Sequence, residues 1–169
     1  MNAGLYGGFR LVLLPRFEPA AVLDTFVREQ VGLWVGVPTM YWTLLHYVRS
    51  TGLDVSGAAA SLRLCVSGGA PMPLQVLREF EQTFGVRILE GYGLSETAPV
   101  VAFNQLDRPS KPGTVGLPVF GVDIRCVDEH DMPQPPGSPG EILVRGPMLL
   151  RAYRDGRDPK TIDGWFPPI

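Results

Sequence analysis

The stretch LRLCVSGGAPMPLQVLREFEQTFGVRILEGYG, residues 62–93, places an amphipathic segment between two apolar runs. Leu62–Val66 and Val86–Glu90 are short and rich in apolar residues, which is typical of buried strands. Between them, Leu74–Phe84 repeats apolar residues at helical spacing. This order predicts two parallel strands joined by a crossover helix.

The segment that precedes this stretch, residues 19–48, shows the same alternation of helix and strand patterns. Pro19–Gln30 carries an amphipathic helical pattern, with a proline suited to the first turn. An apolar run at Leu33–Val37 predicts a buried strand, and Pro38 then opens a second helical pattern that extends through Val48. Together with residues 62–93, these elements predict an α/β fold: a partial doubly wound sheet with flanking helices.

The C-terminal part is predicted to be a small antiparallel β subdomain. Val119–Val127 and Glu141–Arg145 are short β-favouring runs separated by proline and glycine. A polar, proline-containing stretch near Asp107 separates the two patterns. We therefore expect an α/β subdomain over residues 1–107 and a β-rich subdomain over residues 108–169.

Composition narrows the class of protein. Hydrophobic residues make up 45% of the 169 residues and charged residues 19%, proportions that favour a packed globular core over disorder. A net charge of -2 with scattered basic residues argues against a nucleic-acid partner. The longest apolar runs fall far short of the roughly 20 residues that span a bilayer. We expect no transmembrane segment.

Cysteine usage suggests a reducing compartment. Cys65 and Cys126 form no CxxC pair, and each lies in a strand-like apolar run, which predicts two small buried hydrophobic residues without chemistry. The N-terminus lacks the pattern of a signal peptide. We therefore expect a cytoplasmic protein.

Two glycine-rich strings follow predicted strands: SGGAP at Ser67–Pro71 and EGYG at Glu90–Gly93. The carboxyl ends of parallel strands face one crevice, where glycine lets a ligand approach the backbone. Tyr92 can offer a stacking face to a base, Ser95 a hydroxyl to a phosphate, and Glu96 a carboxylate to Mg²⁺. Each residue also has an ordinary structural interpretation, and neither string is a Walker A motif. From residue types alone, the function stays open.

The exact sequences of these strings resemble the motifs of a known protein superfamily. GYGLSET at Gly91–Thr97 resembles the YG-x-(S/T)-E motif of the adenylate-forming (AMP-binding) superfamily. Further similar strings occur in the family's order: VPTMY at 37–41, SGGAPMP at 67–73, PGEILVRGPMLLRAY at 139–153 and DGWF at 163–166. The resemblance implies an internal fragment of the large N-terminal domain of an acyl-CoA synthetase, of the long-chain fatty-acid–CoA ligase type.

The resemblance also implies roles for particular residues. Residues expected to line the adenine side are Gly68, Gly69, Ala70 and Pro71, with Glu90, Gly91, Tyr92 and Gly93 completing the nucleotide pocket. Ser95 would contact phosphate and Glu96 would hold Mg²⁺, which makes both expected catalytic residues. Such enzymes join an apolar carboxylic acid to ATP as an acyl-adenylate, releasing pyrophosphate, and coenzyme A then displaces AMP.

The chain departs from the family pattern in three places. It contains no Ser/Thr/Gly-rich loop with the phosphate-binding lysine, and no C-terminal domain of the family. After Trp165 and Phe166 it reads Pro167, Pro168 and Ile169, where the family has Arg-Thr-Gly-Asp. We therefore expect the isolated chain to lack full activity and to bury exposed apolar surface by self-association.

Alternative functions stay open at this point. The chain could belong to an aryl-acid or amino-acid adenylating domain, although WVGVPTMYW at 34–42 offers no acidic partner for an amino group and favours an apolar acid. It could also be a non-catalytic remnant that binds nucleotide or a protein partner. The helix beginning at Pro38 fits either an acyl-pocket wall or an ordinary core helix.

Overall fold

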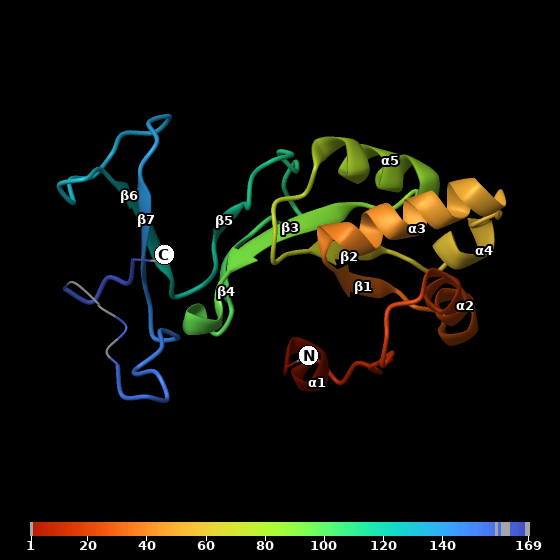
Figure 1. Cartoon of the computed structure of the whole chain (residues 1–169), viewed down its shortest axis with the longest axis horizontal. Helices are drawn as coiled ribbons and strands as arrows, with labels where there is room; N and C mark the ends of the chain where they lie inside the picture. The colour runs from red at the N-terminus through yellow and green to blue at the C-terminus, as the bar shows by residue number, and fades with distance from the viewer. Residues whose placement is uncertain (1, 158, 160–162, 168–169) are drawn as a thin grey trace. The chain divides into compact units, whose positions relative to one another are not determined.

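A computed structural model describes residues 2–157, 159 and 163–167 of the chain (Figure 1). Contacts group the residues into two units, one formed by the chain up to 66 together with 72–88, and the other by 67–71 together with the chain from 89 onward. The boundary predicted near Asp107 stays a prediction. Pro168 and Ile169, at the expected departure from the family pattern, lie outside the described residues.

The first unit contains the predicted alternation of helices and strands. Its elements are α1 (Asn2–Tyr6), α2 (Pro19–Glu29), β1 (Leu33–Gly36), α3 (Pro38–Thr51), α4 (Ser56–Ala59), β2 (Leu64–Ser67) and α5 (Leu74–Phe84). Helices α2 and α3 each begin with a proline, whose fixed φ suits the first turn. The predicted helices and strands are confirmed to within a few residues, and α5 matches at both ends. The short helices α1 and α4 were not predicted.

Helices α3 and α5 lie side by side and enclose an aromatic core (Figure 1). The ring centroid of Tyr41 lies 4.4 Å from that of Trp34 and 4.9 Å from that of Phe80. Tyr41 is fully buried, and its hydroxyl donates a 2.7 Å hydrogen bond to the carbonyl oxygen of Val66. For this side chain, the core interpretation of the helix at Pro38 is therefore correct.

The remaining strands extend the sheet. They are β3 (Ile88–Gly93), β4 (Val100–Phe103) and β5 (Leu117–Pro118), with a one-turn 3₁₀ helix η1 (Ser95–Thr97) between β3 and β4. The five strands are hydrogen-bonded in the order β1-β2-β3-β4-β5, with β4 antiparallel to both β3 and β5. The α/β class is confirmed, but antiparallel pairing already begins at β4, which the sequence analysis did not identify.

A second, two-stranded antiparallel sheet follows, as predicted. It pairs β6 (Asp123–Val127) with β7 (Glu141–Arg145), so the first strand is shorter than the predicted run from Val119. Phe166 extends this sheet by exchanging two backbone hydrogen bonds with Val144, at 2.9 and 2.8 Å. Among the described residues, the apolar core beside the β6–β7 sheet is small.

The two cysteines differ in how deeply they are buried. Cys65 is fully buried, as predicted, and burial raises the pKa of its thiol to about 12. Cys126 is only half-buried, so the prediction of a second buried cysteine is wrong. Its strand belongs to a sheet of only two strands, which has too few side chains to cover both faces.

Some apolar side chains remain exposed. On β1, the exposed fraction is 50% for Leu33 and 64% for Val35. Such exposure is compatible with self-association, which stays a prediction. In the part of the chain that the structure describes, no helix has the length and apolar character needed to cross a bilayer.

Candidate nucleotide-binding site

The two glycine-rich strings meet in space, within one contact unit. The turn formed by residues 67–71 lies against the end of β3, where a Cβ atom placed on Gly68 would be 3.4 Å from the carbonyl oxygen of Gly91. Gly69 has a φ of 81°, a left-handed conformation that strongly favours glycine. The predicted proximity of the two strings is therefore present in the structure.

The strand β3 ends in a bulge beside Tyr92. Its pairing with β4 is regular at Gly91 and Tyr92 and then shifts by one residue at Gly93. A Cβ atom on Gly93 would overlap the carbonyl oxygen of Pro99, so only glycine allows this close approach. Tyr92 is half-buried, and desolvation raises the pKa of its phenol, so the side chain is a neutral ring at physiological pH.

Ser95 and Glu96 lie on η1, and a buried threonine fixes this short helix. The Oγ1 atom of Thr97 accepts a 2.9 Å hydrogen bond from the backbone N–H of Leu94, and its own hydroxyl lies 2.9 Å from the carbonyl oxygen of Pro99. Ser95 is exposed, so its hydroxyl is accessible to a ligand. The turn is thus held by Thr97, while the side chain of Ser95 is exposed.

Glu96 makes two hydrogen bonds to the segment that follows β7. Its carbonyl oxygen accepts a 2.8 Å bond from the N–H of Leu150, and its Oε1 accepts a 3.2 Å bond from the hydroxyl of Tyr153. Desolvation and the adjacent Glu96 carboxylate raise the pKa of Tyr153, so its hydroxyl keeps its proton for this bond.

Glu90 is buried and turned toward a neighbouring loop. Its Oε2 accepts a 3.4 Å hydrogen bond from the N–H of Gly113, and its carbonyl oxygen accepts a 3.0 Å bond from the N–H of Asn104. The side-chain amide of Asn104 also donates to the carbonyl oxygen of Thr114, at 2.7 Å. These hydrogen bonds of Glu90 and Asn104 therefore hold residues 113–114 beside β3. A direct role of Glu90 in a base pocket stays a proposal.

Sequence reasoning missed three residues of this region. Ser67 is 1% exposed, and its Oγ has no hydrogen-bond partner among the described residues. Thr97 and Tyr153 hold η1 and Glu96. Ser67 and Thr97 belong to the quoted motif strings and could have been singled out, whereas nothing in the sequence links Tyr153 to Glu96.

These features are typical of a nucleotide-binding α/β protein, in which glycine-rich turns gather at strand ends. A family model described as AMP-binding enzyme matches residues 1–154. The chain belongs to the AMP-binding enzyme family.

Known proteins of this family resemble the chain over nearly its full length. It is 34% identical to a long-chain-fatty-acid–CoA ligase of Bacillus subtilis (strain 168), covering 98% of the chain and 30% of the ligase. It is 36% identical to a feruloyl-CoA synthase of Amycolatopsis sp, covering 96% of the chain and 33% of the synthase. The crystal structure of ATP-bound MatB from Rhodopseudomonas palustris superposes with a TM-score of 0.86 at 32% identity, covering 98% and 33% of the two chains. The chain thus spans about a third of the length of these relatives.

Proposed function

We propose that the chain forms the adenylate-binding part of an ATP-dependent acid–CoA ligase. The observation that carries the proposal is the meeting of the 67–71 turn with the end of β3, next to a half-buried Tyr92. The glycines let these segments pack closely: a Cβ atom on Gly68 would lie 3.4 Å from the carbonyl oxygen of Gly91, and one on Gly91 would overlap the ring of Phe103. The buried, unpartnered Oγ of Ser67 offers this region a polar group that a nucleotide could satisfy.

The residues divide into two groups in this proposal. The adenine side comprises Gly68, Gly69, Ala70, Pro71, Glu90, Gly91, Tyr92 and Gly93. Ser95 donates its hydroxyl to a phosphate oxygen, because it is exposed on the fixed turn that follows β3. Tyr92 contributes a stacking surface, for which its neutral ring is suited.

The donor set suits Mg²⁺ bound together with phosphates. Mg²⁺ in such sites takes one or two protein carboxylates and completes its coordination with phosphate and water oxygens. Glu96 provides one carboxylate, and no group of three or more acidic, histidine or cysteine ligands occurs among the described residues. When bound, the ion would neutralise phosphate charge. Glu96 would hold it, and Ser95 would orient the phosphate beside it.

The reaction proposed for the whole protein is activation of a carboxylic acid. The carboxylate attacks the α-phosphorus of ATP to give an acyl-adenylate and pyrophosphate, and the thiol of coenzyme A then displaces AMP to give the thioester. The contribution of this chain is to orient the adenylate and to balance its charge.

We propose an apolar acid as substrate. The segment around Trp34–Trp42 carries no acidic side chain that would pair with a substrate amine. A fatty acid is the first candidate, given the similarity to the Bacillus ligase. An aromatic acid is the second, and the comparable similarity to the feruloyl-CoA synthase favours it.

Calorimetric titration with stable adenylate analogues tests the proposal. The 169-residue chain is titrated, with Mg²⁺, with a dodecanoyl and a feruloyl sulfamoyl-adenosine. Both should bind if the adenine half-site is formed, and the tighter one indicates the acid class. Tyr92→Ala should weaken binding at least about fivefold, because base stacking on an aromatic ring contributes about 1–3 kcal/mol.

Tyr6→Ala is the matched control, because Tyr6 is 97% exposed and belongs to the other contact unit. It should bind like the unmodified chain. Failure of the unmodified chain to bind either analogue would refute the proposal, as would equal binding by the Tyr92→Ala variant.

A further inference from the structure

The one-turn helix that carries Glu96 is tied to a segment more than fifty residues later in the chain. Tyr153 donates its hydroxyl to Glu96 Oε1 at 3.2 Å across a sequence separation of 57 residues. The N–H of Leu150 donates to the carbonyl oxygen of the same glutamate at 2.8 Å. A three-residue 3₁₀ helix has little order of its own, so these two bonds constrain both the backbone and the side chain of Glu96.

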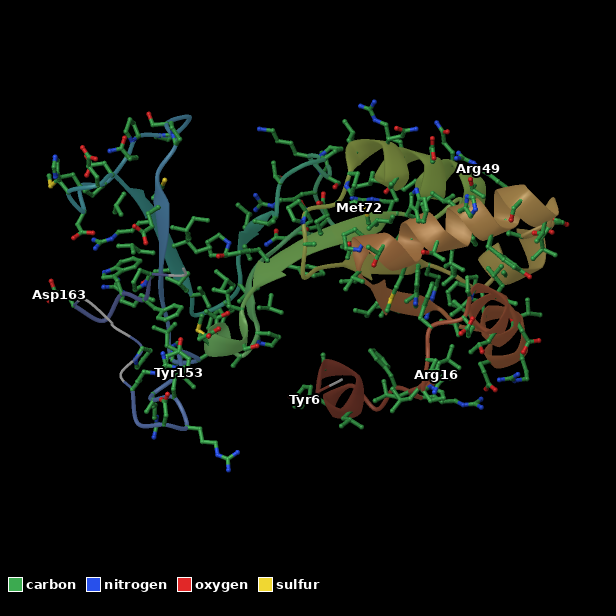
Figure 2. All side chains as sticks on the ribbon, in the orientation of Figure 1. Tyr6, Arg16, Arg49, Met72, Tyr153 and Asp163 are labelled. Atoms are coloured by element: carbon green, nitrogen blue, oxygen red, sulfur yellow. The ribbon has the colours of Figure 1, made fainter. Side chains whose placement is uncertain are left out.

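Tyr153 is itself held in place. Its N–H donates to the carbonyl oxygen of Arg157 at 3.0 Å, and the guanidinium of Arg157 lies 5.0 Å from the centre of the tyrosine ring. Arg157 in turn pairs with Asp155 at 2.7 Å. Figure 2 shows Tyr153 on the loop that follows β7. The ring is therefore supported by its own turn, independently of its bond to Glu96.

The hydrogen bond from Tyr153 engages one of the two oxygens of the Glu96 carboxylate. Tyr153 occupies Oε1 of Glu96, and Oε2 accepts no hydrogen bond from the described residues. A hydroxyl donor on one carboxylate oxygen fixes the plane of the group and leaves the other oxygen to a metal ion. Such outer partners of metal ligands typically change metal affinity by about 10- to 100-fold when removed.

We infer that Tyr153 is a positioning residue that orients the Glu96 carboxylate toward the divalent cation of the bound nucleotide. The inference rests on the metal-binding role given to Glu96 in the proposed function. Tyr153 does not touch the nucleotide in this arrangement. It acts through one oxygen of Glu96.

The test measures the binding of Mn²⁺, a paramagnetic substitute for Mg²⁺, to the 169-residue chain saturated with ATP, by electron paramagnetic resonance. Tyr153→Phe keeps the ring and its contact with Arg157 and removes only the hydroxyl. It should weaken Mn²⁺ binding about tenfold. Binding of the acyl-adenylate analogue without metal should be unchanged, a difference that a purely structural role of Tyr153 would not produce.

Two further variants separate the metal-binding role of Glu96 from the positioning role of Tyr153. They are Glu96→Gln and a double variant. The double variant Tyr153→Phe/Glu96→Gln should bind Mn²⁺ no more weakly than Glu96→Gln alone, because Tyr153 acts through that carboxylate. Tyr6→Phe controls for loss of an exposed hydroxyl and should have no effect.

Three outcomes would overturn the inference. Loss of Mn²⁺ binding in Glu96→Gln with unchanged binding in Tyr153→Phe would reject it and leave the proposed function standing. Equal Mn²⁺ binding in Glu96→Gln and the unmodified chain would reject the metal role of Glu96 and the inference with it. An equal loss of metal and analogue binding in Tyr153→Phe would show a structural role only.

Discussion

The two contact units of this molecule are stabilised differently. The first is built around a continuous apolar core in which rings of Trp34, Tyr41 and Phe80 are in contact. In the β6–β7 region of the second, the described residues Val127, Leu143 and Trp165 form a small buried cluster. There the Trp165 ring also contacts the guanidinium groups of Arg125 and Arg145.

The candidate site residues belong to the second unit. The turn at 67–71, the end of β3 and the helix η1 are held by backbone and side-chain hydrogen bonds, with glycines where chains approach closely. A large apolar core contributes stability without placing polar groups, whereas a hydrogen-bonded region can present them. We therefore expect substitutions in the first unit to change stability and substitutions around the site to change binding.

The largest expected effect is on the aromatic core. Phe80 is fully buried, with its ring centroid 4.3 Å from that of Phe84. Phe80→Ala should lower the free energy of unfolding by about 3–5 kcal/mol, because it removes a large apolar side chain and leaves a cavity. Urea unfolding followed by circular dichroism measures the loss.

Phe120→Ala is the control for Phe80→Ala, since Phe120 is completely exposed. It should leave the midpoint of urea unfolding nearly unchanged. Equal midpoints for the Phe80 and Phe120 variants would mean that the aromatic core does not dominate the stability of the first unit.

The second prediction uses the buried thiol of Cys65. Its pKa is raised from 9.0 to about 12 by burial, so the unfolded chain releases this proton at lower pH than the folded chain. Stability is therefore fully present below pH 9 and should fall as pH rises toward 12, by up to about 1.4 kcal/mol per pH unit for this group.

Between pH 9 and 10, Tyr41, whose pKa burial also raises, contributes to the pH dependence of both the unmodified chain and Cys65→Ala, so the difference between them reports the cysteine. Urea unfolding of the unmodified chain and of Cys65→Ala is compared at several pH values in this window. The slope of stability against pH should be smaller for the variant, and parallel slopes would contradict a buried neutral thiol.

The third prediction concerns the Trp165 stack. The guanidinium carbons of Arg125 and Arg145 lie 4.3 and 4.5 Å from the centre of the ring. Trp165→Phe weakens both cation–π contacts and should cost about 1 kcal/mol. Hydrogen exchange at the amides of Val144 and Phe166 should accelerate about fivefold, since these amides open when the β6–β7 sheet does.

Amides of α5 (Leu74–Phe84) should keep their exchange rates, because they belong to the other contact unit. Trp42→Phe provides the control, as Trp42 is 57% exposed and lies in the first unit. If α5 amides accelerated as much as those of β7, the two units would not be separate in stability.

The sequence predicted the first unit better than the second, for a physical reason. A helix such as α5 buries one face, so its apolar residues repeat at a period that local sequence reveals. Strand β4 has four residues and directly follows the turn at η1, so it presents no comparable pattern. Its antiparallel pairing with β3 shifts register between Tyr92 and Gly93, and the glycine of a motif string gives no sign of that pairing.

The candidate site was also predicted only as far as local sequence patterns reach. The strings SGGAP and EGYG identified the turns that meet, because glycine is needed where backbones approach. The partner of Glu96 was not predictable, because Tyr153 is 57 residues away and one sequence contains no information on such a pair. The orientation of the Glu90 carboxylate toward Gly113 was likewise outside the reach of local patterns.

The smallest expected effect is also the most direct test of the division between stability and binding. The Oγ of Ser67 is buried without a hydrogen-bond partner among the described residues, a state that costs free energy in the unliganded protein. Ser67→Ala should therefore raise the free energy of unfolding by about 1 kcal/mol. It should weaken binding of the acyl-adenylate analogue about fivefold, the value of one hydrogen bond.

Ser61→Ala is the matched control, because the hydroxyl of Ser61 has a partner, the carbonyl oxygen of Val31, at 3.1 Å. Removing a bonded hydroxyl should lower stability and leave analogue binding unchanged. Urea unfolding and calorimetry on the same preparations give both quantities. If Ser67→Ala lost stability as Ser61→Ala does, its hydroxyl would have a partner in solution, and the argument for an unsatisfied polar group awaiting a nucleotide would fail.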